Sequence, residues 1–214
     1  MKTLIVTGTD TGIGKTTVCA MLALALDGFY WKPIQSGTGD GTDRERVIAM
    51  TGLPPTRFFP ERYILREPLS PHRAAELDGV DIELSNLDVP RGPDDRWLVV
   101  EGAGGVLVPI TRDMLQTALF SRWRAPVVVV ARTALGTINH TLLTLEALKH
   151  RAIPVLGVIF VGPAMPDSEA TISAIGGVKR LGRLPMLPCL DAVSLREAFA
   201  AHFEARDFEA AYGA

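Results

Sequence analysis

The chain has 214 residues, 47% of them hydrophobic and 21% charged, so most of it is expected to fold around an apolar core. Its 22 basic and 24 acidic residues give a net charge of −2, which argues against binding to nucleic acid mainly through phosphate contacts. The two cysteines, Cys19 and Cys189, are too few for a disulfide scaffold. The apolar runs are shorter than the ~20 residues of a membrane helix, and the N-terminal one is too short for a signal peptide. We therefore expect a soluble, cytoplasmic protein.

Short apolar runs rich in β-branched residues recur along the chain, as is typical of strands buried on both faces of a parallel sheet. In chain order they cover residues 3–7, 29–33, 96–102, 125–131, 153–161 and, more weakly, 181–185. Helical patterns occupy residues 15–26, 43–51, 113–123, 137–150 and 194–203. This alternation predicts an α/β fold with a mainly parallel central sheet.

Several predicted helices begin at residues that commonly cap helix N-termini, namely Asp43, Asp113, Thr137 and Ser194. The stretch 52–96 is rich in proline and charge, so we expect loops with short helices packed over one end of the sheet. Residues 81–95 allow only a short turn before the next strand. The prediction is a single domain over residues 1–214, in which residues 200–214 can form a mobile tail.

The strongest motif is GTDTGIGKTT at residues 8–17, which follows the first strand and opens the first helix. Glycines let backbone N–H groups approach a phosphate, and the helix N-terminus adds partial positive charge. Lys15 is expected to reach the β- and γ-phosphates of a nucleoside triphosphate, and the Thr16 hydroxyl to ligate Mg²⁺. Thr9 stands where the strict pattern has its first glycine, so a Gly-rich turn with a chance lysine remains an alternative. With the strand pattern, the motif predicts a three-layer fold of the P-loop NTPase type.

Polar residues at the ends of two other predicted strands point to a metal and an anionic substrate. Ligands of open α/β sheets bind beyond the carboxyl ends of strands, where Glu101 and Asp43 are expected. Together with Thr16 they form a plausible Mg²⁺ set, although Glu101 can be a turn residue and Asp43 alone is more often an N-cap. Lys32 can stabilise a transferring phosphoryl group, with Ser36 bonding the substrate. A lysine at the end of a strand can equally face solvent.

Five segments in order resemble the dethiobiotin synthetase family: TGTDTGIGKT (7–16), KPIQSG (32–37), EPLSPH (67–72), VEGAGG (100–105) and LGTINHTLLT (135–144). The resemblance covers roughly residues 3–187. It implies that 7,8-diaminononanoate (7,8-diaminopelargonate), CO₂ and MgATP give dethiobiotin, ADP and phosphate, in the penultimate step of biotin synthesis. A substrate carbamate and a carbamic–phosphoric anhydride are the implied intermediates.

The resemblance also implies roles for the residues of the matching motifs. Lys15 and Lys32 would neutralise the carbamate and the phosphates, while Thr16, Asp43 and Glu101 would hold Mg²⁺. The implied substrate contacts are Thr9 and Ser36. The implied nucleotide contacts are Gly12, Ile13, Gly14, Lys15, Thr16, Thr17, Asp43, Glu101, Gly102, Ala103 and Gly104, with Pro185, Met186 and Leu187 at the adenine.

The family resemblance further implies a homodimer with the active site at the subunit interface. Gly136, Thr137 and Asn139 would bind the distal carboxylate of the substrate from the second subunit, and a helix N-terminus suits a carboxylate. Thr137 can also cap the helix while Asn139 bonds locally. One departure concerns the base: Val161 stands where the family often places an Asn that reads adenine, so we expect a relaxed nucleotide preference.

Three other functions compete with this one. An ATP-dependent switch of the partition or septum-site type would carry a lysine where this loop has Asp10, and often ends in a basic amphipathic helix, whereas this tail is slightly acidic. An amidotransferase-linked synthetase of the cobyrinate type needs a glutaminase domain, for which 214 residues leave no room. An inactive binding module would have lost Lys15 or Glu101, and both are present.

Overall fold

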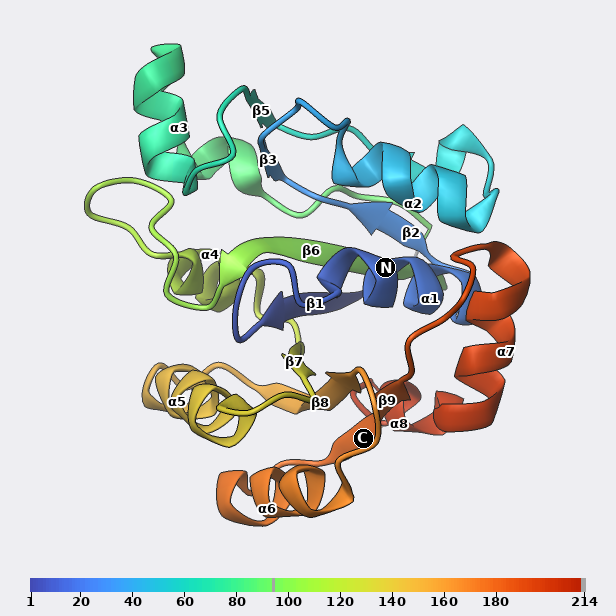
Figure 1. Cartoon of the computed structure of the whole chain (residues 1–214). Helices are drawn as coiled ribbons and strands as arrows, with labels where there is room; N and C mark the ends of the chain where they lie inside the picture. The colour runs from blue at the N-terminus through green and yellow to red at the C-terminus, as the bar shows by residue number, and fades with distance from the viewer. Residues whose placement is uncertain (94, 213–214) are drawn as a thin grey trace.

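A computed structural model describes residues 1–93 and 95–212, and its core is one twisted parallel sheet (Figure 1). The strand order in the described ranges is β4 (Phe58–Phe59), β2 (Phe29–Trp31), β6 (Trp97–Gly105), β1 (Lys2–Gly8), β7 (Val127–Arg132), β8 (Val155–Val161) and β9 (Arg180–Leu184). Every one of these pairings is parallel. A small separate sheet pairs β3 (Ile34–Ser36) with β5 (Tyr63–Leu65).

Helices cover both faces of the sheet because alternate residues of each strand point to opposite sides. In β1, Leu4 and Val6 face one apolar cluster and Ile5 faces the other. The first cluster is closed by α1 (Lys15–Ala25), α2 (Asp43–Thr51), α7 (Ala192–His202) and α8 (Ala205–Glu209). The second is closed by α3 (Pro71–Asp78), α4 (Gln116–Trp123), α5 (Thr137–His150) and α6 (Pro166–Gly176). The three-layer α/β fold predicted from the sequence is confirmed.

The stretch 52–96, between α2 and β6, has more regular structure than the sequence predicts. It contains α3 and the 3₁₀ turns η1 (Pro55–Arg57) and η2 (Leu84–Leu87), which agree with the expected short helices. It also supplies β4 and β5, strands of two and three residues that are too short for a periodic pattern to indicate. The predicted short turn before β6 is confirmed as η2, while Asp94 lies outside the described residues.

None of the four predicted N-caps is the observed one, and the error at Asp43 bears on the site. Thr42 caps α2, accepting a hydrogen bond from the Glu45 backbone while Glu45 bonds back to it, so Asp43 is the first helical residue and its side chain is left free for other contacts. Asp191, not Ser194, caps α7.

The other two predicted N-caps, Asp113 and Thr137, are also wrong. Helix α4 begins only at Gln116, after Leu115 instead of Asp113. Thr137 is the first residue of α5, preceded by Gly136 in the left-handed region at φ 90°.

The C-terminal segment packs onto the sheet as far as the structure describes it. Phe203 and Phe208 are buried in the same cluster as α1 and α7. Gly182 of β9 lies so close to Phe203 that a Cβ there would approach its ring within 2.4 Å. Residues 200–212 of the predicted tail therefore make tertiary contacts, and residues 213–214 lie outside the described residues. In the ranges described, no helix combines the length and apolar character needed to cross a bilayer.

Candidate active site

The loop between β1 and α1 is shaped to receive an anion. Gly12 and Gly14 adopt left-handed backbone conformations, at φ 69° and 97°, which lets the loop turn back over the start of α1. The first backbone N–H groups of α1 have no partner within the helix and point towards the loop. The Lys15 ammonium folds across the loop and donates to the Asp10 carbonyl at 2.7 Å. Burial, partly offset by the charge of Glu101, lowers the pKa of Lys15.

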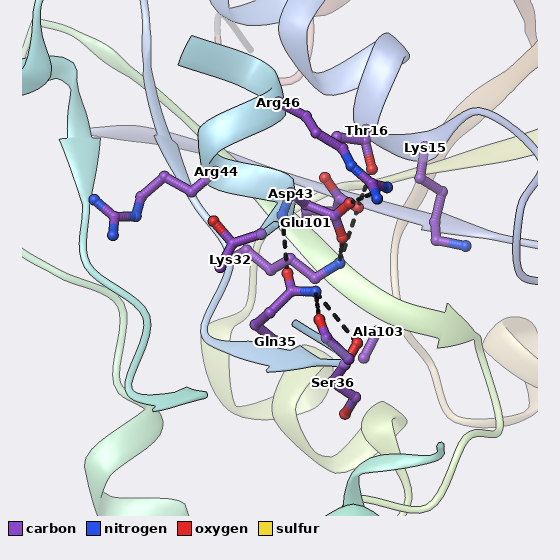
Figure 2. A network of polar contacts seen from close by, with 12 residues as sticks. Lys15, Thr16, Lys32, Gln35, Ser36, Asp43, Arg44, Arg46, Glu101 and Ala103 are labelled. Atoms are coloured by element: carbon purple, nitrogen blue, oxygen red, sulfur yellow. Dashed lines mark hydrogen bonds and ion pairs between the residues drawn. The ribbon is translucent and has the colours of Figure 1, made fainter. Parts of the chain in front are cut away.

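A cluster of buried charges lies beside this loop (Figure 2). Glu101, at 1% exposure, accepts hydrogen bonds on Oε1 from the Thr16 hydroxyl at 2.9 Å and from Lys32 Nζ at 3.3 Å. Lys32 Nζ also forms an ion pair with Asp43. The other oxygen, Oε2, accepts from the Tyr30 hydroxyl at 2.9 Å.

The sheet order explains why these residues meet. Strands β2, β6 and β1 are neighbours and run parallel, so their carboxyl ends lie at one edge. Glu101 is the middle residue of β6, four residues before its carboxyl end, Lys32 directly follows β2, and Thr16 lies in the first turn of the helix after β1. Three segments far apart in the chain thus place their functional groups at one edge of the sheet, as is typical of ligand sites in open α/β folds.

The electrostatics keep Lys32 charged. Burial alone would lower its pKa, but the charges of Glu101 and Asp43 and the hydrogen bonds to them more than offset this, and the pKa of Lys32 is raised. Behind Glu101, burial and the charge of that carboxylate raise the pKa values of Tyr30 and Cys19 well above their usual range. Both groups are therefore neutral at physiological pH and can act as donors.

The donor set fits Mg²⁺ by its chemistry. Thr16, Asp43 and Glu101 offer a hydroxyl and two carboxylates, all hard oxygen donors. In the part of the chain that the structure describes, no group of three or more His, Cys, Asp or Glu side chains forms a protein-only metal site. Mg²⁺ commonly takes only one or two carboxylates and completes its shell with waters and substrate phosphates. The arrangement suits that mode of binding and does not suit a structural metal.

A cleft of about 970 Å³ opens over the cluster between the phosphate loop, α2 and residues 66–71. It is lined by eleven of the predicted site residues: Gly12, Gly14, Lys15, Thr16, Thr17, Lys32, Ser36, Asp43, Glu101, Ala103 and Gly104. The Ile13 side chain is instead buried in the core, and Gly102 is covered by Gln116, whose Nε2 would lie 3.0 Å from an added Cβ. Thr9 is outside the lining and donates its backbone N–H to the Val130 carbonyl.

Two predicted groups lie away from this cleft in the single chain. The first group lies at the start of α5, with Gly136 as its N-cap and Thr137 and Asn139 in its first turn. Thr137 is buried, and its hydroxyl has no hydrogen-bond partner among the described residues. Asn139 is exposed. Pro185, Met186 and Leu187 follow β9, with Met186 75% exposed and Leu187 packed against the core. Val161 lies against the phosphate loop, since a Cβ on Gly14 would come within 3.1 Å of its Cγ1.

The structure also adds residues that the sequence motifs did not single out. Gln35 accepts from the Asp43 backbone N–H at 3.1 Å and donates to the Gly37 carbonyl at 2.9 Å, which ties α2 to the loop after β3. Gln116, 2% exposed, accepts from the Ala103 N–H at 2.5 Å. Gln35 lies inside the KPIQSG segment and could have been found there, whereas nothing local marks Gln116. Other additions to the cleft wall include Arg46, Arg66 and Leu190.

The fold and the phosphate loop define an α/β protein of the P-loop NTPase type. Solved structures of the septum site-determining protein MinD share this fold. That of *Pyrococcus horikoshii* OT3, complexed with Mg-ADP, matches with a TM-score of 0.53 and 15% identity over 92% of this chain and 85% of its own. The MinD cell division ATPase of Pyrococcus furiosus matches with a TM-score of 0.51 and 13% identity, over 94% of this chain and 99% of its own. At these identities the likeness is one of fold only.

Sequence comparison gives a narrower assignment. A family profile described as an AAA domain matches residues 2–194. The ATP-dependent dethiobiotin synthetase BioD of *Novosphingobium aromaticivorans* is 56% identical over 208 residues, covering 97% of this chain and all of that protein. The protein of the same name from *Rhodopseudomonas palustris* strain TIE-1 is 58% identical over 205 residues, covering 96% of both. The chain belongs to the dethiobiotin synthetase family, as its five motifs predict.

Proposed function

We propose that this chain is an ATP-dependent dethiobiotin synthetase, a ligase of biotin biosynthesis that joins 7,8-diaminononanoate and CO₂ at the expense of MgATP. The observation that carries the proposal is the convergence of Lys15, Lys32, Thr16, Asp43 and Glu101 on one cleft. That cleft has a phosphate loop on one side and Ser36 on the other, and its volume of about 970 Å³ accommodates a nucleotide beside a small substrate.

The reaction requires positioning and charge stabilisation, and no protein nucleophile. One substrate amine adds to CO₂ and loses a proton, giving a carbamate. A carbamate oxygen attacks the γ-phosphorus of ATP and ADP departs, leaving a carbamic–phosphoric anhydride. The second amine attacks the carbamoyl carbon, the ring closes, and phosphate and a proton leave. Negative charge is thus present on the carbamate and spreads over the transferring phosphoryl group.

The two lysines are placed to meet that charge from different sides. Lys15 lies in the phosphate loop and Lys32 beside the two acids, so Lys15 would neutralise the β- and γ-phosphates and Lys32 the carbamate and the transferring group. Both are buried, so their charges act in surroundings where electrostatic interactions are stronger than in water. Mg²⁺, when bound to Thr16, Asp43 and Glu101, would supply further positive charge at the β- and γ-phosphates.

The remaining site residues would bind and orient the reactants. The backbone of residues 12–17 would cradle the phosphates, and Ala103 and Gly104 would allow close approach of the nucleotide on the β6 side. Ser36, whose buried hydroxyl lacks a hydrogen-bond partner among the described residues, would bond the substrate. Pro185, Met186 and Leu187 would line the adenine site. Thr9, which precedes the cleft-lining part of the phosphate loop, would contact the substrate at the edge of the cleft.

We further propose a cytoplasmic homodimer whose active site is completed by the second subunit. Gly136, Thr137 and Asn139 lie outside the cleft of their own chain, at the start of a 14-residue helix whose free N–H groups attract carboxylates. In a dimer they would bind the distal carboxylate of the substrate held by the partner's cleft.

The activity is tested by incubating the protein with diaminononanoate, bicarbonate and MgATP and measuring dethiobiotin and phosphate. Equimolar formation of both products supports the proposal. Absence of turnover in a protein whose circular dichroism and melting curve show an intact fold would overturn it.

The shared site is tested by mixing two inactive variants, Lys15→Ala and Asn139→Ala. In a mixed dimer, one cleft combines both intact residues and the other combines both changes, so random assortment restores about a quarter of wild-type activity. If mixing and re-equilibration restore nothing, although light scattering shows dimers, the site is not shared.

A further inference from the structure

A buried tyrosine contacts Glu101 from the side opposite the cleft. Tyr30 lies in β2, fully buried, and its hydroxyl donates to Glu101 Oε2 at 2.9 Å. It is paired in register with Val99 of β6, and Glu101 is two residues further along that strand, so it points to the same face. The Tyr30 side chain therefore lies next to Glu101 on the α1 face of the sheet.

The two oxygens of Glu101 have separate partners. Oε1 faces the Thr16 hydroxyl at 2.9 Å and Lys32 Nζ at 3.3 Å, both of which line the cleft. Oε2 faces inward to Tyr30, which does not line the cleft. A carboxylate rotates readily about its last side-chain bond, since that torsion has broad minima. A hydrogen bond to one oxygen therefore decides where the other one points.

The hydroxyl is the part of Tyr30 that matters here. The ring packs in the apolar cluster, edge-on to Phe58 with centroids 6.2 Å apart, and a phenylalanine would keep those contacts. Removing the hydroxyl, however, would leave Oε2 of a carboxylate that is only 1% exposed without its 2.9 Å donor. A buried carboxylate that loses a donor is destabilised, and the Cys19 thiol, the other group behind Glu101, is only a weak donor. The carboxylate would therefore reorient.

We propose that Tyr30 is a positioning residue, whose hydroxyl holds Glu101 with Oε1 directed at Thr16 and Lys32 so that the cleft binds Mg²⁺ together with the nucleotide. The inference rests on the proposed nucleotide and metal site. Tyr30 acts through Glu101 and touches neither reactant. Groups that orient a metal-binding carboxylate from behind typically contribute 10- to 100-fold to metal affinity or activity.

The first test compares Tyr30→Phe with Tyr63→Phe by calorimetric titration of ADP with and without Mg²⁺. Tyr63 is a matched control because its hydroxyl accepts hydrogen bonds only from Glu83 and Asn86 among the described residues, outside the cleft. For Tyr30→Phe we expect the gain in ADP affinity on adding Mg²⁺ to fall by about 10-fold or more, while ADP binding in EDTA changes less than about twofold. For Tyr63→Phe neither quantity should change.

The same titrations separate the two proposals. Wild-type protein that binds ADP no better with Mg²⁺ than in EDTA would contradict the proposed metal site itself. A wild type with a clear Mg²⁺ effect and a Tyr30→Phe variant with the same effect would overturn only the role of Tyr30. A variant that loses ADP affinity equally with and without Mg²⁺ would also overturn it, because that pattern indicates general distortion of the loop.

A double-mutant comparison tests whether Tyr30 acts through Glu101. In a Glu101→Gln background the charged carboxylate is absent, so Tyr30→Phe should change the Mg²⁺ effect no further. An undiminished loss in that background would show that Tyr30 acts by another route.

A spectroscopic measurement keeps the inference testable even if Tyr30→Phe does not fold. The chain has three tyrosines, so in protein labelled with ¹³C at the phenol carbon the Tyr30 resonance is assigned by eliminating those lost in Tyr63→Phe and Tyr212→Phe. Adding Mg²⁺ to the ADP complex should shift the Tyr30 resonance, because the metal withdraws electron density from the accepting carboxylate. A Tyr30 resonance that stays unmoved while ADP affinity rises would refute the coupling.

Discussion

Replacing Lys32 by glutamine is the sharpest test of how the cleft handles charge. Lys32 is buried, forms an ion pair with Asp43 and lies 3.3 Å from Glu101 Oε1. Glutamine keeps a polar end and part of the side-chain volume but removes the positive charge. The two acids then face each other and the reacting anions with one cation fewer.

The geometry sets the scale of the effect. Two unit charges 3.3 Å apart, the separation of Lys32 Nζ and Glu101 Oε1, interact by about 5 kcal/mol at an effective dielectric constant of about 20, which gives the order of magnitude of one close charge contact in this cleft. Removing one group that stabilises developing charge typically costs about 3–4 kcal/mol in the barrier, or a 100- to 1000-fold loss of kcat. Because the charge builds up mainly during transfer, the KM for diaminononanoate should change only a few-fold.

The assay is steady-state production of dethiobiotin at saturating MgATP, with kcat and KM determined separately. Lys149→Gln is a suitable control, because it makes the same chemical change on the exposed end of α5, outside the cleft. Variants that lose kcat and substrate affinity by equal factors would refute the assigned role, since that pattern indicates a group that binds substrate and transition state alike.

Three further outcomes follow from the structure. Because the apolar Val161 lies against Gly14, we expect CTP and GTP to support turnover alongside ATP. Val161→Asn should shift this preference towards ATP. Strict dependence of the wild type on ATP in the same assay would contradict the hypothesis. Hydrogen bonds from Arg112 and then Arg73 lower the pKa of Glu76 to about 2, so this carboxylate stabilises the fold above its ordinary pKa of 4.5 and loses that contribution as the pH falls towards 2. Glu76→Gln should therefore flatten the fall in urea stability between those pH values, and parallel curves for both proteins would contradict it. Phe208→Ala should lower the free energy of unfolding by about 3–5 kcal/mol, because the ring is fully buried; a change below about 1 kcal/mol would show that the C-terminal segment is not packed.

Much of the fold and part of the site could be predicted because their signals are local. The phosphate loop is one continuous motif between a strand and a helix. The long apolar run at residues 125–131 covers all of β7 except Arg132, and the run at 153–161 contains β8. Helix α6 was not predicted, although Pro166 at its start and two acids in its first turn are helix-start signals. Its apolar residues show only weak helical periodicity, so these start signals alone did not indicate a helix.

Asp43 illustrates a local competition that the sequence left open. Thr42 and Asp43 are both good N-caps, and the capping box formed by Thr42 and Glu45 decides between them. The consequence reaches the site, because an Asp43 that capped α2 would turn its carboxylate to the backbone instead of to Lys32. The pattern T-x-x-E at residues 42–45 was the available signal.

Tyr30 and Gln116 could not have been found in this way. Tyr30 reads as one more apolar strand residue, and its contact with Glu101 depends on β2 lying directly beside β6. Gln116 reaches Ala103 from the first turn of α4, across a loop whose path no local pattern indicates. Spatial order of strands is a property of the whole chain, so residues that act only through it carry no local signature.

The strand order also has a consequence for how the protein folds. The bonds of Glu101 to Thr16, Tyr30 and Lys32 span 85, 71 and 69 residues of chain. Contacts of such high sequence separation carry a large loop-closure cost and form slowly. Before β6 docks, the chain can form the phosphate loop, but Glu101 is not yet beside it. A nucleotide with its metal therefore does not stabilise this early state through Glu101. A ligand at 100 times its dissociation constant adds about 2.7 kcal/mol to the stability of the state it binds. The ligand therefore stabilises only the state with the completed sheet. Adding it should lower the unfolding rate and leave the folding rate unchanged.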